Sequence, residues 1–379
     1  MPIQTRRGYA YKSSRAPHSR PQRAPRQQRK GYGQYIDPAK FVKVAHPVTP
    51  DEYIPTHEFM DFAVDSRLLA NLSRKGFHLP TPIQDKTIPL GLEGKDVIGI
   101  ANTGTGKTAA FAIPILHRLM TDPTAKALIV APTRELAMQI EEECRTIGKG
   151  GGFSGALLIG GSAYGPQLRD LRARPRIIIG TPGRIMDHLR EGSLKLNDCN
   201  LVVLDEVDRM LDMGFVNDVR KLLGDLAASR QSFYFSATMD RRVAELIDGF
   251  SPDAATVSVR QGDTSENVHQ DIIPYADKSS KLEGLHTLLI EPLVTKAIIF
   301  ESTQRNVERL ERELQNRGFE VTSIHGGKTQ GQRKRALDGF KASKPRFLIA
   351  TDVAARGIDV PDVSHVINYG MPQTYEDYT

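Results

Sequence analysis

Short runs of Val, Ile and Leu alternate with amphipathic segments along most of the 379-residue chain. The runs are continuous rather than broken by every second residue, which is typical of parallel strands that helices cover on both faces. The predicted strands of the first series are residues 96–100, 127–131, 156–159, 176–180, 201–205 and 232–236. Amphipathic segments such as 134–146 and 215–227 lie between them. This rhythm predicts an α/β fold with a doubly wound parallel sheet.

A polar stretch without periodicity, residues 258–266, interrupts the rhythm and is the predicted linker. A second series of predicted strands follows it, at residues 297–301, 320–324, 346–350 and 365–368. We therefore expect two tandem α/β domains, 46–257 and 267–379. The second is the shorter, and we expect it to be truncated at its C-terminal side.

Positive charge is concentrated at the N-terminus. Residues 1–45 carry eleven Lys and Arg and a single acid, Asp37, for a net charge of +10, while the rest of the chain has 40 basic and 44 acidic residues. The segment is rich in Arg, Gly, Gln, Ser and Pro and has no apolar periodicity, so we expect it to be disordered. Two interpretations stay open: a solvating tail, or a tail whose Arg and Tyr side chains contact the phosphates and bases of single-stranded nucleic acid.

Two classes of protein are excluded by composition. No run approaches the eighteen or so apolar residues of a membrane helix, and no apolar block of a signal peptide follows the basic N-terminus, so we expect a cytoplasmic protein without membrane contact. The two cysteines, Cys144 and Cys199, are too few for a disulfide framework or a zinc site.

A glycine-containing loop follows the first predicted strand. Residues 101–108 read Ala-Asn-Thr-Gly-Thr-Gly-Lys-Thr and lead into an apolar helix. A strand, such a loop and a helix start together present backbone N–H groups to phosphate oxygens. Lys107 suits the β- and γ-phosphates of a nucleotide and Thr108 suits Mg²⁺. A strict P-loop has Gly where Ala101 stands, and the alternative is an ordinary turn. The predicted nucleotide-binding residues of this loop are Ala101, Thr103, Gly104, Thr105, Gly106, Lys107 and Thr108.

An acidic cluster ends another apolar strand. Residues 201–204 lead to Asp205-Glu206-Val207-Asp208, at the carboxyl edge of the sheet where ligands bind. Asp205 suits Mg²⁺, and Glu206 suits the role of polarising the attacking water. On its own the cluster would be a solvated acidic turn; after a P-loop it predicts the chemistry of nucleotide hydrolysis.

With these elements placed, the chain from Phe59 onwards resembles a DEAD-box RNA helicase of helicase superfamily two. Residues 76–84 (Gly-Phe-His-Leu-Pro-Thr-Pro-Ile-Gln) are similar to the Q motif of that family, and Phe59 stands where the family keeps an isolated aromatic. The resemblance implies that the Gln84 amide pairs with the N6 and N7 edge of adenine and that the Phe59 ring stacks on the base, which would select ATP. Without it, the two residues would be a helix cap and a core ring.

Further loops match the family in order. Residues 132–137 resemble motif Ia, 160–161 the GG element, 181–184 motif Ib and 236–238 (Ser-Ala-Thr) motif III, which in the family couples hydrolysis to strand separation. The resemblance implies catalytic roles for Lys107, Ser236 and Thr238 as well as for the two acids. It also implies that the other loops grip the RNA backbone without reading bases. The residues implied to contact RNA are Pro132, Thr133, Arg134, Gly160, Gly161, Thr181, Pro182, Gly183 and Arg184.

The second series also aligns with the family. Residues 330–333 have its Gln-x-x-Arg spacing, and residues 350–359 closely resemble motif V. The resemblance implies RNA contacts for Gln330, Arg333 and Thr351 and an ATP ribose contact for Asp359. A Gln–Arg pair one helical turn apart is otherwise usually a surface feature.

Two departures from the family pattern stand out. Val207 replaces the family's Ala, a small apolar change between retained acids. Motif VI, a His-Arg-x-Gly-Arg-x-Gly-Arg run with the arginine fingers, would begin directly after Thr379, so we expect little RNA-stimulated hydrolysis from residues 1–379.

The resemblance implies two RecA-like domains that close on ATP, Mg²⁺ and single-stranded RNA, in an ATP-dependent RNA helicase or RNP remodeller. A non-catalytic ATP-dependent RNA clamp is the alternative, and a DNA-directed helicase is a third. The RNA and the protein partners, such as ribosomal or RNA-decay proteins, cannot be named from this pattern.

Overall fold

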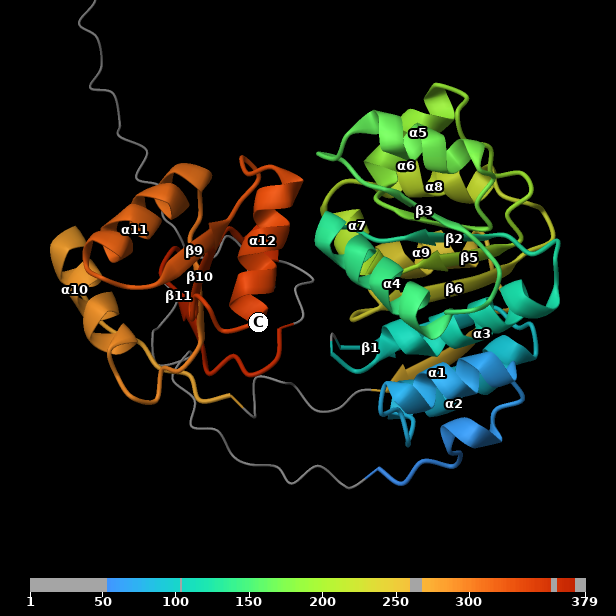
Figure 1. Cartoon of the computed structure of the whole chain (residues 1–379), viewed down its shortest axis with the longest axis horizontal. Coiled ribbons are helices and arrows are strands. Elements are labelled where there is room, and N and C mark those ends of the chain that lie inside the picture. Colours follow the sequence, from blue (N-terminus) through green and yellow to red (C-terminus); the bar gives the residue numbers. More distant parts are fainter. Residues whose placement is uncertain (1–52, 103, 260–267, 356–359, 372–379) are drawn as a thin grey trace, which may run out of the picture.

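The structure, a computed structural model, describes residues 53–102, 104–259, 268–355 and 360–371. The predicted tail 1–45, Thr103, Asp359 and most of the predicted linker lie outside the described residues. Two parallel sheets, each flanked by helices, make up two units (Figure 1). In the described ranges, no helix combines the length and the apolar character needed to cross a bilayer.

The first unit contains seven strands. In chain order its elements are η2 (Phe59–Asp61), α1 (Ser66–Arg74), α2 (Pro82–Leu92), β1 (Val97–Ala101), α3 (Lys107–Thr121), β2 (Ala127–Val130), α4 (Arg134–Ile147), β3 (Gly155–Leu158), α5 (Tyr164–Arg172), β4 (Ile177–Gly180), α6 (Pro182–Arg190), β5 (Leu201–Leu204), α7 (Val207–Asp212), α8 (Val216–Gly224), β6 (Gln231–Ser236), α9 (Arg241–Asp248) and β7 (Ala255–Val259). The strand order is β3-β4-β2-β5-β6-β1-β7, and every pairing is parallel.

Alternate side chains of each central strand enter different cores. In β5, Leu201 and Val203 pack with α1 to α4, while Val202 and Leu204 pack with α6 to α9. Both faces of the sheet are therefore covered, which is why the strands have continuous apolar sequences. The predicted doubly wound parallel sheet is confirmed.

The second unit has a four-stranded sheet with the order β11-β8-β10-β9. Its elements are α10 (Lys278–Leu289), β8 (Ala297–Phe300), α11 (Gln304–Asn316), β9 (Val321–Ile324), α12 (Gln330–Lys341), β10 (Phe347–Ala350), α13 (Asp352–Ala355) and β11 (His365–Asn368). Helices α10 and α11 cover one face, and α12 covers the other. All four predicted strands are present and pair in parallel.

One strand of the first sheet was not predicted. Strand β7 pairs in parallel with β1 at the sheet edge. Ser258 and Val259, which we had assigned to the linker, are its last two residues. Its Ala-Thr-Val-Ser-Val sequence alternates, and only Val257 is buried, as suits an edge strand with one covered face.

Candidate functional site

The order of the strands sorts the predicted functional loops into two neighbouring groups. Because all strands are parallel, their carboxyl ends share one edge. The loops after β5, β6 and β1, which are adjacent in the sheet, contain the acidic cluster, the Ser-Ala-Thr motif and the P-loop. The loops after β3, β4 and β2 contain the GG element and motifs Ib and Ia. The expected nucleotide loops and the expected RNA loops thus lie side by side.

The P-loop joins buried strand β1 to helix α3. Gly106, the residue before α3, has a φ of +87°, which L side chains rarely adopt. Lys107 opens the helix with only 6% of its surface exposed, and its Nζ has no hydrogen-bond partner in the described part of the chain. A buried ammonium without a partner is costly, so the loop is suited to receive an anion at this helix start.

The Q-motif residue Gln84 is attached to the P-loop. Its Nε2 donates to the carbonyl oxygen of Gly106 at 3.0 Å, and its Oε1 accepts from the Thr81 N–H at 2.9 Å. The Thr81 hydroxyl donates to the Thr105 carbonyl oxygen at 2.8 Å. A Cβ on Gly106 would lie 2.3 Å from Gln84 Nε2, so a side chain there would displace the Gln84 amide as well as strain the backbone.

Phe59 is packed into the core. Its ring is 2% exposed and makes edge contacts with Phe62 and Phe77, at centroid distances of 5.9 and 5.5 Å. Stacking on a base, the role implied by the family resemblance, requires the ring or the residues that cover it to move.

Two acids follow strand β5. Asp205 is 2% exposed, and the pKa of its carboxyl is raised to about 6. Burial is the main cause; Lys107 counteracts part of the rise, and the Glu206 and Asp208 carboxylates add to it. Glu206 has a φ of +53° and a ψ of +56°, an unfavourable left-handed conformation for a side chain of this size. Its Oε2 forms an ion pair of 2.6 Å with Arg209 Nη1. Backbone strain thus coincides with the residue that we predicted to be the general base.

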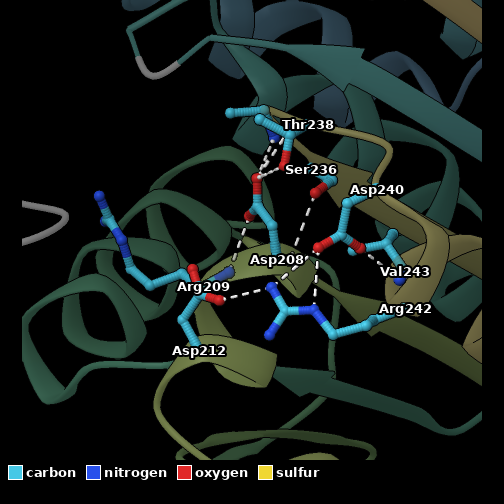
Figure 2. Close-up of polar contacts among 9 residues, drawn as sticks. Asp208, Arg209, Asp212, Ser236, Thr238, Asp240, Arg242 and Val243 are labelled. Atoms are coloured by element: carbon cyan, nitrogen blue, oxygen red, sulfur yellow. Dashed lines mark hydrogen bonds and ion pairs between the residues drawn. The ribbon is translucent and has the colours of Figure 1, made fainter. Parts of the chain in front are cut away.

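Asp208 connects the acidic cluster to the Ser-Ala-Thr motif (Figure 2). Its Oδ2 accepts from the N–H groups of Ala237 and Thr238 at 3.1 and 2.8 Å and from the Thr238 hydroxyl at 3.0 Å. In return, the Asp208 N–H donates to the Ser236 hydroxyl at 3.3 Å. We did not predict a role for Asp208, although its place in the four-residue acidic run was a usable signal. The loops after β5 and β6 are therefore fastened together.

A second link joins helices α7 and α9. Arg242 Nη2 donates to Asp212 at 2.7 Å and to Asp240 at 2.8 Å, while Asp240 accepts from the Val243 N–H at the start of α9 (Figure 2). These side chains are half exposed, so we treat the link as a minor addition to the Asp208 contacts.

The loops after β2, β3 and β4 also contact one another. The Arg134 guanidinium lies against the GG element, where a Cβ on Gly161 would be 2.1 Å from its Nη1. Arg184 Nη1 donates to the Ser162 carbonyl oxygen at 3.3 Å, and its guanidinium lies 5.3 Å from the centre of the Tyr164 ring. Thr133 caps α4, and Pro182 opens α6 after Thr181. The structure therefore brings the first unit's predicted RNA residues to one edge.

In the second unit, two predicted RNA residues contact the first unit instead of facing open solvent. Arg333 Nη2 forms an ion pair of 2.8 Å with Glu135 Oε2, and the two side chains are 8% and 5% exposed. Gln330 Nε2 lies 3.5 Å from Glu135 Oε1 and 3.0 Å from the sulfur of Met138. Helix α12 thus meets the first turns of α4, within and directly after motif Ia. Thr351, half buried after β10, is not part of this contact.

The fold and these loops define a P-loop nucleotide-binding protein built from two RecA-like units. A DEAD/DEAH box helicase family model matches residues 81–246, and a helicase conserved C-terminal domain model matches residues 280–379. The chain belongs to the DEAD-box helicase family.

Relatives and solved structures agree with this assignment. The ATP-dependent RNA helicase CshA of Listeria monocytogenes is 41% identical over 322 residues, which is 85% of this chain and 62% of the relative. The DEAD-box ATP-dependent RNA helicase CshA of Bacillus subtilis is 42% identical over 325 residues, 85% of this chain and 66% of the relative. The chain thus spans somewhat less than two thirds of the length of these relatives.

Two solved structures match most of the chain. Saccharomyces cerevisiae Dbp5 bound to RNA and ADP BeF3 has a TM-score of 0.71 at 30% identity and covers 84% of this chain and 82% of its own. A DEAD box protein from Methanococcus jannaschii has a TM-score of 0.52 at 36% identity, covering 86% and 88%.

Proposed function

We propose that the chain forms the two ATP- and RNA-binding domains of an ATP-dependent RNA helicase or RNP remodeller. It binds ATP with Mg²⁺ and the backbone of single-stranded RNA, and it separates short duplexes by domain closure coupled to hydrolysis. The observation that carries the proposal is the strand order, which sets the loops after β1, β5 and β6 beside those after β2, β3 and β4.

The P-loop region supplies phosphate and base recognition in this proposal. Lys107, buried and without a partner among the described residues, would bind the β- and γ-phosphates. Each atom of the Gln84 amide makes one hydrogen bond within the protein, so one N–H and one oxygen lone pair remain for adenine. This arrangement favours ATP over GTP.

The donors near the P-loop fit a magnesium ion. Asp205 is buried and forms no ion pair in the described part of the chain, and burial raises the pKa of its carboxyl more than nearby Lys107 lowers it, so a bound cation would stabilise the charged form. Thr108 and Asp205 would hold the ion, and phosphates and water would complete its ligands, since no cluster of three His, Cys, Asp or Glu side chains is found in the described ranges. Bound Mg²⁺ would offset charge on the phosphate oxygens.

Glu206 is the proposed general base. Arg209 engages Oε2 and leaves Oε1 to accept a proton from the attacking water. Hydrolysis would be communicated to the RNA loops through Asp208, whose carboxylate joins the acidic cluster to Ala237 and Thr238.

The loops after β2, β3 and β4 would bind RNA, and domain closure would separate the strands. Arg134 and Arg184, fixed by the GG loop and by Tyr164, would contact phosphates, a mode of binding that carries little base information. The Arg333–Glu135 pair would hold the second unit against the first when RNA and ATP are bound.

The test is an ATPase assay with and without RNA, together with the release of a short labelled strand from a duplex. The assay uses residues 1–379 and a version extended by a His-Arg-x-Gly-Arg-x-Gly-Arg segment with the remaining strand and helices, and the proposal expects both activities of the extended version to depend on Lys107 and Glu206. A non-catalytic ATP-dependent clamp is the second candidate, since neither the Lys107 site nor the Arg333–Glu135 contact involves Glu206. ATP-dependent RNA retention without turnover would favour the clamp.

A further inference from the structure

The residue after Gln84 has an unusual environment. Asp85 is 3% exposed although it carries a carboxylate. Its Oδ2 accepts from the Tyr53 hydroxyl at 2.5 Å and from the Thr56 N–H at 2.8 Å. Its Oδ1 accepts from the His57 N–H at 3.2 Å and from the His57 ring Nδ1 at 2.7 Å. Both oxygens of one buried carboxylate thus hold a segment about thirty residues away in the sequence.

That segment, residues 53–58, is called the strap below, and it leads directly into Phe59. Within the described ranges, every hydrogen bond from residues 53–57 to the body of the domain ends on Asp85. The strap forms no regular secondary structure, and Ile54 is 84% exposed. The His57 ring also lies 5.4 Å from the Phe62 ring, and Tyr53, Pro55 and His57 are half buried, so Asp85 supplies the directional part of the attachment rather than all of it.

The anchor is charged at neutral pH. Burial raises the pKa of the Asp85 carboxyl, but the hydrogen bonds from Tyr53, Thr56 and His57 outweigh that effect and lower it overall. Burial and the bond to Asp85 in turn raise the pKa of Tyr53 to about 12. The Tyr53 hydroxyl, the Thr56 N–H, and the backbone N–H and ring Nδ1 of His57 therefore all donate to a charged carboxylate. Such hydrogen bonds are stronger than those between neutral groups.

Neighbouring residues of α2 thus reach two parts of the nucleotide site. The Gln84 side chain holds the P-loop at Gly106, and the Asp85 side chain holds the strap that leads to Phe59. We propose that Asp85 is a positioning residue for adenine recognition: it fixes the strap on α2, so that the Phe59 ring, once it leaves its contacts with Phe62 and Phe77, meets the base beside Gln84. This inference rests on the proposed function, in which Gln84 pairs with adenine, and on the stacking role that the family resemblance implies for Phe59.

Asp85→Asn is the first variant. It keeps the size of the side chain, but an NH₂ group cannot accept a hydrogen bond, so the backbone N–H of Thr56 or of His57 loses its acceptor and the negative charge of the anchor is lost. We expect the dissociation constant for ADP, measured by titration calorimetry, to rise about tenfold. The constant for GDP, which lacks the adenine contacts, should change less, so the preference for ADP over GDP narrows.

Asp96→Asn is the matched control. Asp96 also accepts from a backbone N–H, that of Ser232 at 2.7 Å, and from a hydroxyl, that of Ser251, but it lies before β1 at the opposite edge of the sheet. Its replacement should lower the melting temperature and leave the ratio of ADP to GDP affinity unchanged.

Tyr53→Phe removes one hydrogen-bond donor to Asp85 without altering α2. It takes the place of Asp85→Asn in the affinity measurements if that variant does not fold. It should also raise the dissociation constant for ADP, and its effect should not add fully to that of Asp85→Asn, since both changes weaken the same anchor. Gln84→Ala tests the proposed adenine site separately from the proposed role of Asp85. If Gln84→Ala leaves the ADP preference intact, the proposed adenine site is wrong.

Two results would overturn the inference while the adenine site stands. In the first, Gln84→Ala narrows the preference and neither Asp85→Asn nor Tyr53→Phe does. In the second, these two variants lower the melting temperature as Asp96→Asn does, with the ratio of ADP to GDP affinity unchanged, so that Asp85 has a structural role alone.

Discussion

Replacing Arg333 by Met should weaken RNA binding only when an ATP analogue is bound. The ion pair to Glu135 joins α12 of the second unit to α4 of the first, and both side chains are almost fully buried. When the units separate, both charges return to water, so the variant loses the net strength of the pair rather than the full cost of an isolated buried charge. We estimate a coupling of about 1–3 kcal/mol, a factor of about 5–150 in affinity.

The assay is fluorescence anisotropy with a labelled single-stranded RNA, in the presence of a non-hydrolysable ATP analogue or of ADP. Glu135→Gln should show the same nucleotide-dependent loss, and the double variant should lose little more, because the two residues act through one contact. Arg309→Met, which removes a charge from exposed α11, is the control. The reasoning is refuted if Arg333→Met weakens binding equally with both nucleotides while Glu135→Gln does not, since Arg333 would then contact RNA directly.

Two further predictions concern single side chains, and a third concerns the N-terminal segment. Lys107→Ala should abolish ATP binding in calorimetry with little change in melting temperature, because the buried Nζ has no partner in the described part of the chain; unchanged ATP affinity would contradict the P-loop assignment. Because the pKa of Asp205 is about 6 in the folded chain and near 4 when unfolded, its ionisation opposes folding, so nucleotide-free stability should fall as the pH rises from about 4 to about 6. Asp205→Asn should remove that fall in thermal unfolding measurements; an identical pH profile for both proteins would contradict it. Deleting residues 1–45, with its net charge of +10, should weaken RNA binding and flatten its salt dependence; an unaltered salt slope would favour a solvating tail.

The fold was predictable because buried parallel strands require continuous apolar runs, and those runs are present in both series. Strand β7 was not predicted because an edge strand with one covered face resembles a polar linker in sequence. The positions of Lys107, Asp205 and Glu206 in the loops after β1 and β5 could be predicted, because each loop directly follows a continuous apolar run; their roles stay predictions.

Contacts that form between distant segments could not be predicted in the same way. The Arg333–Glu135 pair joins residues 198 positions apart, and nothing in the local sequence of either one specifies the other. The burial of Phe59 depends on Phe62 and Phe77, and the attachment of the strap depends on Asp85. Packing and the sheet order, rather than local pattern, determine these contacts.

The most direct test of the central claim is RNA affinity as a function of nucleotide in the Glu206→Gln variant. An amide cannot accept the proton of the attacking water as a carboxylate does, so this protein should bind ATP and Mg²⁺ without turning ATP over. Closure of the two units on ATP predicts that anisotropy with labelled single-stranded RNA gives at least tenfold tighter binding with ATP than with ADP. Equal affinity with the two nucleotides would contradict the coupling of the P-loop site to the RNA loops.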